Sequence, residues 1–559
     1  MKMNRRGLLG LFGAGAAGGY ASAAMAKQTP VVRFDHGVAS GDPLSDRVIL
    51  WTRVTPPEGF VAPVMVQWRV LEAVSDTVVT SGHIQTGQDR DYTVKIDATG
   101  LKAGAEYRYQ FFVGEVASPV GRTRTLAANG VRPVNLAVVS CQLYPGGLFN
   151  AYEAIADLPE LDAVIHLGDY IYEYGASASD YGMATGPMLN RLHEPAHEII
   201  SLSDYRIRHA QYKTDADLQS AHARAPFICV WDDHETANDA WMHGAENHQP
   251  ETEGEFATRK AIALQAYYEW MPIREAAAGQ MREAINRSLH FGDLASLMMV
   301  ETRLTGRTKA LDYASDLTAK EGPGGEPVLD LEAFAALRND PSRAMMASDQ
   351  HAWLRGELAA SKAAGRQWQV LGNQVVMARV AGPDVSRMMS AEQVAGLMAQ
   401  IPEAYRDQFE QAMFLFKMGL PFNLDAWDGY PADRERLYAD FAEAGVKPIV
   451  LSGDSHAFWV NDLKDASGQR RAVELGTASV SSPSIADALG GFPLGQALMQ
   501  ANEEVVLCDQ SAKGFILLTL AEDHAEARLM QVSTIFAKPF TTAPLARFHI
   551  SPDGALAAL

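Results

Sequence analysis

Five apolar runs, each ending in polar residues, constrain the fold of this chain more than any other feature of its sequence. They read NLAVVSCQ (135–142), LDAVIHLGDY (161–170), APFICVWDDHE (225–235), WQVLGNQ (368–374) and VKPIVLSGDSH (446–456), and helical patterns such as 255–271 lie between them. Buried strands that alternate with helices are typical of layered α/β folds, where ligands bind beyond the carboxyl ends of the strands. We therefore predict an α/β domain over residues 133–545, with its site at these strand ends.

A different pattern precedes this domain. Between Val31 and Thr125, short runs such as RVILWTRVTP and AEYRYQFFVG alternate apolar and polar residues and are separated by turn residues. This spacing indicates a small all-β sandwich of immunoglobulin or fibronectin type, which we assign to residues 30–127. Because no cluster of His, Cys and carboxylates stands out in it, we treat it as accessory. The length of 559 residues also favours two domains over one.

Three further segments carry structural expectations but no constellation of their own. Residues 319–327 contain Gly and acidic side chains, which predicts a surface loop, and residues 391–420 are expected to form a helical insertion. Residues 514–532 alternate as an antiparallel hairpin does.

The first 26 residues have the composition of an export signal. Basic residues precede a short apolar run rich in Gly and Ala, and Ala24-Met25-Ala26 provides a small-x-small cleavage site. The pair Arg5-Arg6 resembles a twin-arginine signal, which would deliver the folded protein to the periplasm or the exterior through the twin-arginine machinery. An ordinary secretory signal that contains two arginines is the alternative.

The overall charge excludes some functions. A formal net charge of -20 argues against stable nucleic-acid binding, which needs a basic face. The surplus acids serve either as a solvated surface or also as cation ligands. No later run reaches the roughly 18 apolar residues of a membrane span, so we expect none after signal removal.

Three cysteines, Cys141, Cys229 and Cys508, cannot all pair within one chain. One disulfide with a free thiol, or no disulfide and a metal-bound thiolate, both remain open.

Two of the strand ends carry carboxylates in unusual settings. Gly168-Asp169 follows one apolar run, with Tyr172 three residues later, and Asp232-Asp233-His234-Glu235 ends another. Adjacent carboxylates resist joint ionisation, and a bound cation would resolve that conflict. The alternatives are an Asp169 that caps a helix beside a packed Tyr172, and a solvated acidic turn at 232–235.

Two more strand ends complete the pattern. Asp454 and His456 follow Gly453, and Cys141 precedes a Gly-rich turn. Each has a plain alternative, because a single His is commonly structural and a buried Cys behaves as a small hydrophobe. Their position at corresponding strand ends favours a common site.

In order, these four segments resemble the blocks of the calcineurin-like metallophosphoesterases, and in particular the PhoD-type alkaline phosphatase/phosphodiesterase family. VVSCQ, HLGDYIYEYG, VWDDHE and LSGDSH correspond to its blocks, and FDHGVASGDPLSDRVILWTRVTP, WQVLGNQVV and ELGTASVSSPS extend the resemblance over almost the whole chain after the signal. The block patterns depart from those of the wider superfamily in their ligand types.

The resemblance implies two cation sites that share Asp169. Cys141, Asp169, Tyr172 and His456 would hold iron, expected in the ferric state, whereas Asp233 and Asp454, with Asp232 nearby, would form an oxygen-only site. Oxygen-only ligation favours hard cations, so we expect calcium there.

The implied activity is hydrolysis of small phosphate esters by in-line attack of a hydroxide held between the two cations, with His234 protonating the leaving group. Arg303 and Asn373 follow apolar runs and either bind substrate or make structural hydrogen bonds. The alternatives are a phosphodiesterase or phospholipase D-like enzyme with the same centre, and a non-catalytic exported calcium-binding protein. The retention of His234 and Tyr172 speaks against the last of these.

Overall fold

Two large mixed sheets form the centre of the molecule. The computed structural model describes residues 31–559 except 402, 490 and 491, so the expected export signal lies outside the described residues. The first sheet has the order β24 (Leu556–Ala558), β23 (Thr542–Ile550), β22 (Ala525–Val532), β21 (Lys513–Leu520), β9 (Val134–Val139), β10 (Ala163–His166), β11 (Phe227–Cys229), β1 (Val38–Gly41), β2 (Arg47–Arg53) and β5 (Thr93–Thr99). The second has the order β12 (Arg287–Phe291), β13 (Ala295–Met299), β16 (Trp368–Gly372), β17 (Ile449–Ser452), β19 (Arg470–Gly476), β18 (Phe458–Lys464) and β20 (Val505–Asp509).

Each of the five apolar runs of the sequence contains a parallel strand of one of the two sheets, namely β9, β10, β11, β16 or β17. Strands β9, β10 and β11 are parallel neighbours in the first sheet, and β13, β16, β17 and β19 are parallel neighbours in the second. One continuous apolar core contains residues of both sheets, including Val138, Ile165, Val370 and Leu451. Burial on both faces explains the lack of apolar–polar alternation in these runs. The layered α/β prediction is confirmed.

Helices cover the outer faces of the sheets. Helices α1 (Asn150–Ala156), α3 (Leu202–Lys213), α4 (Ala216–Arg224) and α6 (Phe256–Trp270) lie on the side of the first sheet, and α4 packs on β1. Helices α9 (Ser348–Ala363) and α13 (Pro431–Ala444) pack on the second sheet, at β13 and β19. The termini of α3 are well capped, since Ser201 and Asp204 form a reciprocal capping box at its first turn.

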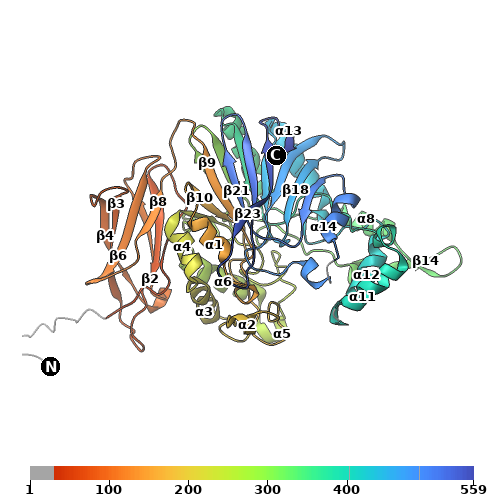
Figure 1. Ribbon diagram of the computed structural model, residues 1–559, viewed down its shortest axis with the longest axis horizontal. Coiled ribbons are helices and arrows are strands. Elements are labelled where there is room, and N and C mark those ends of the chain that lie inside the picture. Colours follow the sequence, from red (N-terminus) through yellow and green to blue (C-terminus); the bar gives the residue numbers. More distant parts are fainter. Residues whose placement is uncertain (1–30, 402, 490–491) are drawn as a thin grey trace, which may run out of the picture.

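The N-terminal strands lie at one end of the molecule (Figure 1). Strands β4 (Val78–Thr86), β3 (Val64–Glu72), β6 (Glu106–Val113), β7 (Val116–Ala117) and β8 (Gly121–Arg124) form a separate sheet. It packs across an apolar core against β1, β2 and β5. Those three strands also continue the ten-stranded sheet, because Gly41 of β1 pairs with Phe227 of β11. The all-β region is therefore joined to the α/β region through backbone pairing.

The opposite end carries the insertions (Figure 1). Residues 319–327, expected as a loop, lie in the exposed hairpin of β14 (Ala319–Glu321) and β15 (Pro327–Leu329). The helical insertion consists of α11 (Ala391–Gln400) and α12 (Glu403–Phe416). Strands β21 and β22 form the expected antiparallel hairpin.

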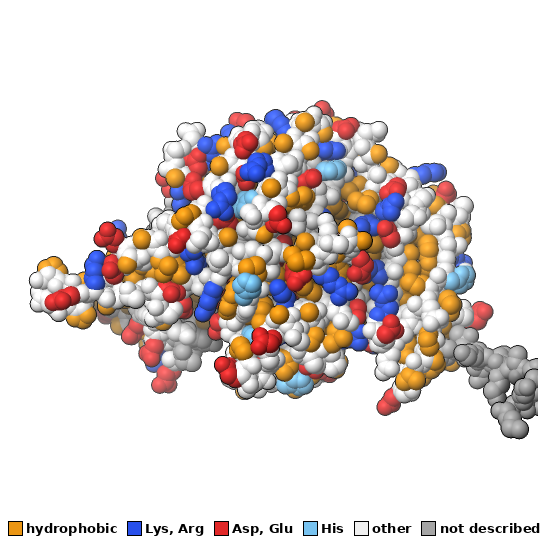
Figure 2. All heavy atoms as spheres, turned by 180° about the vertical axis from the view of Figure 1, so that it is seen from behind, with side chains coloured by type: hydrophobic (Ala, Val, Ile, Leu, Met, Phe, Trp, Pro, Cys, Tyr) orange, Lys and Arg blue, Asp and Glu red, His pale blue; other side chains and the backbone are white. Residues whose placement is uncertain are grey.

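The surface carries charges of both signs. Figure 2 shows acidic and basic side chains interspersed over one face of the molecule. On this face the acidic excess is spread out, as expected for a solvated surface. Among the helices of the described residues, none combines the length and apolarity that crossing a membrane requires.

Candidate active site

The site lies where strands of the two sheets end. Cys141 follows β9, Asp169 follows β10, and Asp232 to His234 follow β11 in the first sheet, while Asp454 and His456 follow β17 in the second. Ser140 pairs with Ser479, which lies just beyond β19, and this bridge joins the two sheets beside Cys141. Segments from distant parts of the sequence thus place their polar side chains in one cluster.

Several residues of the cluster have a backbone conformation that residues other than glycine rarely adopt. Cys141, Asp169, Asp454 and His456 have φ values of 60°, 58°, 58° and 58°, in the left-handed region. Such residues carry local strain and concentrate at functional sites. Gly168 has φ 115°, and a Cβ there would lie 2.4 Å from the backbone nitrogen of Asp232. Only glycine therefore allows the ends of β10 and β11 to approach so closely.

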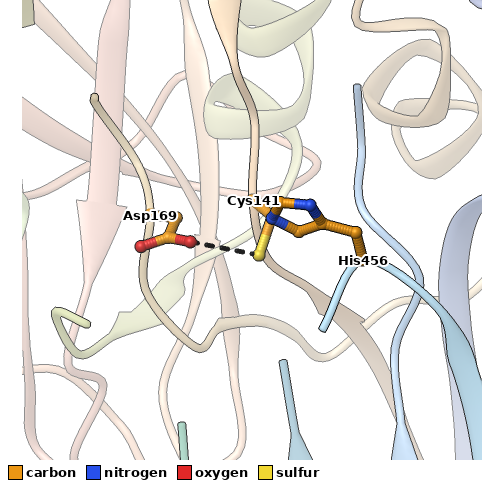
Figure 3. A group of neighbouring side chains, drawn as sticks. All are labelled: Cys141, Asp169 and His456. Carbon is orange, nitrogen blue, oxygen red and sulfur yellow. Dashed lines mark hydrogen bonds between the residues drawn. The ribbon is translucent and has the colours of Figure 1, made fainter. Parts of the chain in front are cut away.

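One half of the cluster offers mixed donor atoms. The Cys141 Sγ lies 3.3 Å from Asp169 Oδ2 (Figure 3), and the Tyr172 hydroxyl donates to the same oxygen at 3.2 Å. The Tyr172 hydroxyl is also 3.4 Å from His456 Nε2. Donor atoms of Cys141, Asp169 and His456 all lie within 4.8 Å of one another. A thiol, a phenol, an imidazole and a carboxylate therefore converge on one point.

His456 is held so that Nε2 faces this point. Its Nδ1 lies 2.6 Å from the carbonyl oxygen of Pro483, to which it donates when it carries the proton. The Tyr181 hydroxyl donates to the same carbonyl at 2.9 Å, and its ring stacks on the imidazole. A proton fixed on Nδ1 leaves the Nε2 lone pair free for a ligand.

The other half contains only carboxylates and an arginine. Oxygens of Asp232, Asp233 and Asp454 lie within 4.8 Å of one another. Arg303, which follows β13, pairs through Nε with Asp232, and its Nη2 lies 3.6 Å from Asp233 and 3.5 Å from Asp454. Its Nη1 donates to Asp425 at 2.7 Å. One fully buried guanidinium thus offsets part of the charge of four carboxylates.

His234 lies between the halves and is oriented by Glu173. Oxygens of Asp169 and Asp233 and a ring nitrogen of His234 also lie within 4.8 Å of one another. The His234 Nδ1 is 2.7 Å from Glu173 Oε2, and Glu173 Oε1 accepts from the Asn238 amide and the Asn247 side chain, each at 2.8 Å. A carboxylate held by three bonds fixes the imidazole ring and keeps the Nδ1 proton in place.

Burial and crowding shift the protonation of these groups. Burial, together with neighbouring carboxylates, raises the pKa of Asp169 and of Asp454 well above the usual range. Burial also raises the pKa of Cys141, and Asp169 adds to that effect. Burial lowers the pKa of His234, but the charges of Asp233 and Glu173 outweigh it and raise the pKa well above the usual value. A bound cation would counter the repulsion among the carboxylates.

The residues present fit bound cations. Asp169 Oδ1, Asp232 Oδ2 and Asp233 Oδ1 are buried and have no hydrogen-bond partner among the described residues. Buried carboxylate oxygens without partners are costly unless a cation or water satisfies them. The mixed half offers a thiol, a phenol and an imidazole, and the other half offers only oxygen. Asp169 shares one donor group with Cys141 and His456 and another with Asp233 and His234, and Asp233 also belongs to the carboxylate group. Asp169 and Asp233 therefore link the two halves of the cluster.

Two residues that the sequence offered as substrate-binding candidates, Arg303 and Asn373, instead make contacts within the protein. Arg303 is fully buried and is absent from the lining of the cleft described below, so it acts on the carboxylates. Asn373 lies outside the cluster, where its side chain donates to the Val375 carbonyl and accepts from the Trp427 indole. These bonds are the structural role that the sequence left open for it. Cys229 and Cys508 are free and buried, as is Cys141.

Three site residues were not identified from the sequence. Glu173 directly follows Tyr172, and Glu235 accepts from the backbone amides of Asp169, Tyr170 and Asp232 and so ties two strand ends together. Both glutamates lie inside the motifs already noted. Their position next to proposed ligands is the one sequence feature that could have identified them. Asp425 bridges Arg303 and Arg307 from a distant loop and has no such signal.

The cluster opens into one large cleft of about 2280 Å³. Asp454 and His456 line it from the cluster, and Tyr174 and Tyr181 line it beside them. Gln408, Phe409 and Ala412 of α12 also line it. The helical insertion therefore forms part of the wall of the site.

This chain is therefore an α/β protein with a candidate two-cation centre. The centre is a buried cluster of thiol, phenol, imidazole and carboxylate groups at the ends of parallel strands. Family models for the PhoD-like phosphatase and for its N-terminal domain match residues 136–529 and 19–127, respectively. The chain belongs to the PhoD-like phosphatase family.

Two relatives agree with this assignment. The chain is 35% identical to alkaline phosphatase D of Bacillus subtilis (strain 168) over 440 residues, which are 77% of this chain and 65% of that relative. The match thus spans slightly less than two thirds of the length of the relative. A solved structure described as the structure of PhoD matches with a TM-score of 0.75 and 29% identity, over 95% of this chain and 92% of that one.

Proposed function

We propose that this protein is a metal-dependent phosphoric ester hydrolase with alkaline phosphatase activity. The observation that carries the proposal is that Asp169 belongs to one donor group with Cys141 and His456 and to a second with Asp233 and His234. Its family membership and its similarity to an alkaline phosphatase D support the same activity. A passive cation site needs neither the imidazole of His234 nor the carboxylate that orients it.

We assign iron to the mixed half, because thiolate, phenolate and imidazole suit it, and calcium to the carboxylate half. Cys141, Asp169, Tyr172 and His456 would hold the first ion, and Asp169, Asp233 and Asp454 would hold the second. When bound, the two cations would supply Lewis acidity that neutralises phosphoryl oxygens and makes a water molecule more acidic.

The protein's own side chains would perform the remaining tasks. Arg303 holds Asp232 and limits repulsion within the carboxylate half, so that the ligands stay in place. Glu173 fixes the His234 ring, and the Nε2 of His234 would donate a proton to the departing alkoxide oxygen. Tyr181 and Pro483 hold His456. The burial of Cys141 and Asp169 excludes bulk water from the reacting centre.

Phosphodiesters are a second candidate substrate, because the cleft is large. Its volume of about 2280 Å³ exceeds the roughly 300–1,000 Å³ typical of small-molecule pockets. A diester needs room for a second substituent beside the phosphorus, and a cleft of this volume, lined in part by α12 and Tyr181, is large enough to provide it.

Hydrolysis of a chromogenic phosphomonoester and of its bis-diester analogue tests the proposal. We expect turnover by protein supplied with iron and calcium and its loss after chelation. Metal analysis of the same sample should find both ions. A protein with its metals bound that hydrolyses neither ester would refute the enzymatic function, and zinc alone in the sample would refute the metal assignment.

We further propose export through the twin-arginine pathway, since a cation-loaded protein is best exported folded. Replacing Arg5 and Arg6 by Lys should retain the protein in the cytoplasm. Export unchanged in that variant would instead support an ordinary secretory route.

A further inference from the structure

The lining of the cleft is unbalanced in charge. Among the described residues that form it, the carboxylates are Asp180, Glu198, Glu246, Asp454 and Asp487. Lys513 is the one lysine in the same lining, and no arginine is found there. The cleft, which we propose to bind an anionic substrate, therefore has a single basic side chain of Lys or Arg type in its lining. The position of this side chain decides whether it can contact the substrate.

Lys513 lies on the side of Cys141 and His456. It begins β21, which pairs antiparallel with β9, and the pair nearest the site is Ile516 with Val138. Continuing this register by three residues brings Lys513 to the level of Cys141. In agreement, the charge of Lys513 contributes, after burial, to lowering the pKa of His456.

The ammonium of Lys513 is fixed yet still has donors to offer. Its side chain is 10% exposed, and Nζ donates to Asp487 Oδ2 at 3.1 Å. Asp487 is itself held by the amide of Ser484 at 2.7 Å. An ammonium has three donors, and the bond to Asp487 is the only hydrogen bond that Lys513 Nζ makes among the described residues. Two donors therefore remain for a ligand in the cleft.

The burial of Lys513 indicates that its ammonium group has a functional role. Burying an ammonium is unfavourable, and burial lowers its pKa, although Asp487 partly offsets this effect. Asp487 is half exposed and has its own backbone partner, so the pair is not needed to satisfy a buried acid. The ion pair with Asp487 therefore does not account for the burial of the Lys513 ammonium.

We propose that Lys513 is a specificity-determining residue that binds a phosphoryl oxygen of the substrate and favours dianionic monoesters over monoanionic diesters. This inference rests on the proposed function. A dianionic phosphoryl group gains more from a nearby ammonium than a monoanionic one does, because the Coulomb energy scales with the charge. The carboxylates of the cleft lining oppose negative charge on the substrate, and Lys513 is the one lysine or arginine of that lining that offsets them.

Steady-state kinetics of Lys513→Gln and Lys513→Arg on a matched pair, an aryl phosphomonoester and its bis-aryl diester, test the inference. For Lys513→Gln we expect kcat/KM to fall at least about tenfold for the monoester and at most about threefold for the diester. Inhibition by inorganic phosphate should weaken in parallel. Lys513→Arg should recover most of the monoester preference, because it keeps the charge.

Lys538→Gln is the matched control. Lys538 is exposed and pairs with Glu153 and Asp217, away from the cleft lining, so its removal changes net charge by the same amount. It should leave the monoester-to-diester ratio unchanged. Thermal unfolding of each variant accompanies the kinetics.

The outcomes separate the two proposals. If metal-loaded wild-type protein hydrolyses neither ester, the proposed function fails. If the wild type is active and Lys513→Gln lowers both activities equally, or neither, the inference about Lys513 fails. An unfolded Lys513→Gln leaves the decision to Lys513→Arg, whose folded form must then keep the wild-type preference.

Discussion

Two adjacent residues, Asp169 and Tyr170, face two buried clusters of opposite character. Asp169 belongs to the candidate active site, whereas the Tyr170 hydroxyl lies 2.8 Å from His222 Nε2 and accepts from Lys213 Nζ at 3.0 Å. The first cluster has a surplus of acids and the second a surplus of bases. Both are buried, but they resolve the cost of burial in different ways.

The basic cluster loses protons. Burial lowers the pKa of Lys213 to about 7 and that of His209 to about 3. The Lys213 ammonium lies 4.5 Å from the Trp51 ring of β2, in a cation–π contact. No carboxylate pairs with Lys213 in the described residues. Aromatic packing and neutral bases thus make a closed interior between the N-terminal strands and the α/β region.

Burial also raises the pKa values of Asp169 and Asp454 in the acidic cluster, but this cluster opens to the cleft. Asp454 is 21% exposed at its side chain, and partnerless oxygens remain on Asp169 and Asp233. Arg303 and His234 supply positive charge but leave these oxygens unsatisfied. The comparison teaches that unsatisfied acids at an opening indicate a ligand site, whereas buried bases among aromatic rings indicate structure.

The largest effect that sharpens this contrast is expected for Asp169→Asn. Loss of the shared carboxylate should reduce kcat/KM by about 10³-fold or more, since several kcal/mol of transition-state stabilisation depend on both cations. Metal content should also fall. Tyr170→Phe, one residue away in the basic cluster, should keep activity within about threefold. Equal losses in both variants would contradict the division into two clusters.

His234→Gln should have the next largest effect. Removing the proton donor should lower kcat by about 10²- to 10⁴-fold for esters with poor leaving groups. Esters whose alcohol leaves without protonation should be affected much less, while metal content stays near that of the wild type. A loss that is the same for both kinds of ester would contradict the assignment of His234 as the acid.

Glu173→Gln should have a moderate effect. A neutral amide still fits the pocket but no longer raises the pKa of His234, so kcat should fall about 10- to 100-fold. A general acid must be protonated to act. The basic limb of the kcat profile should therefore move to lower pH, which a pH series from 6 to 10 would detect. An unshifted profile would show that Glu173 has a purely structural role.

Lys213→Met should have the smallest effect on activity and a distinct effect on stability. The folded-state pKa of Lys213, about 7, lies below its unfolded value, so between the two the unfolded state binds more protons. The stability of the wild type should therefore rise with pH above about 7, and this contribution should be absent in the variant. Denaturant unfolding of both proteins at pH 6, 8 and 9.5 measures the difference.

Lys213→Arg provides the matched control, because a guanidinium does not lose its proton in this range. It should be the least stable of the three proteins at high pH. If the stability difference between wild type and Lys213→Met does not change with pH, Lys213 is not buried as a titrating base.

Much of the candidate site was predictable because its candidate ligands follow strands. Cys141, Asp169, Asp233 and Asp454 each come directly after an apolar run, and parallel strands place such residues along one edge. Glu173 and Glu235 lay inside the same motifs but were not singled out, since an acidic residue near ligands has no distinct pattern. Asp425 and Lys513 lie outside all of these motifs, so no local pattern marked them.

The sequence alone determined the layered α/β class, the strand ends that carry the candidate site residues, and the family, because these depend on local periodicity and on short motifs. Only the tertiary structure decided that Arg303 pairs with buried carboxylates, that Asn373 supports the backbone, and that Lys513 is the one lysine or arginine among the described residues of the cleft lining. Those roles depend on which side chains meet across two sheets and an insertion. The charge and burial of side chains at such contacts depend on three-dimensional packing, which local sequence patterns do not predict.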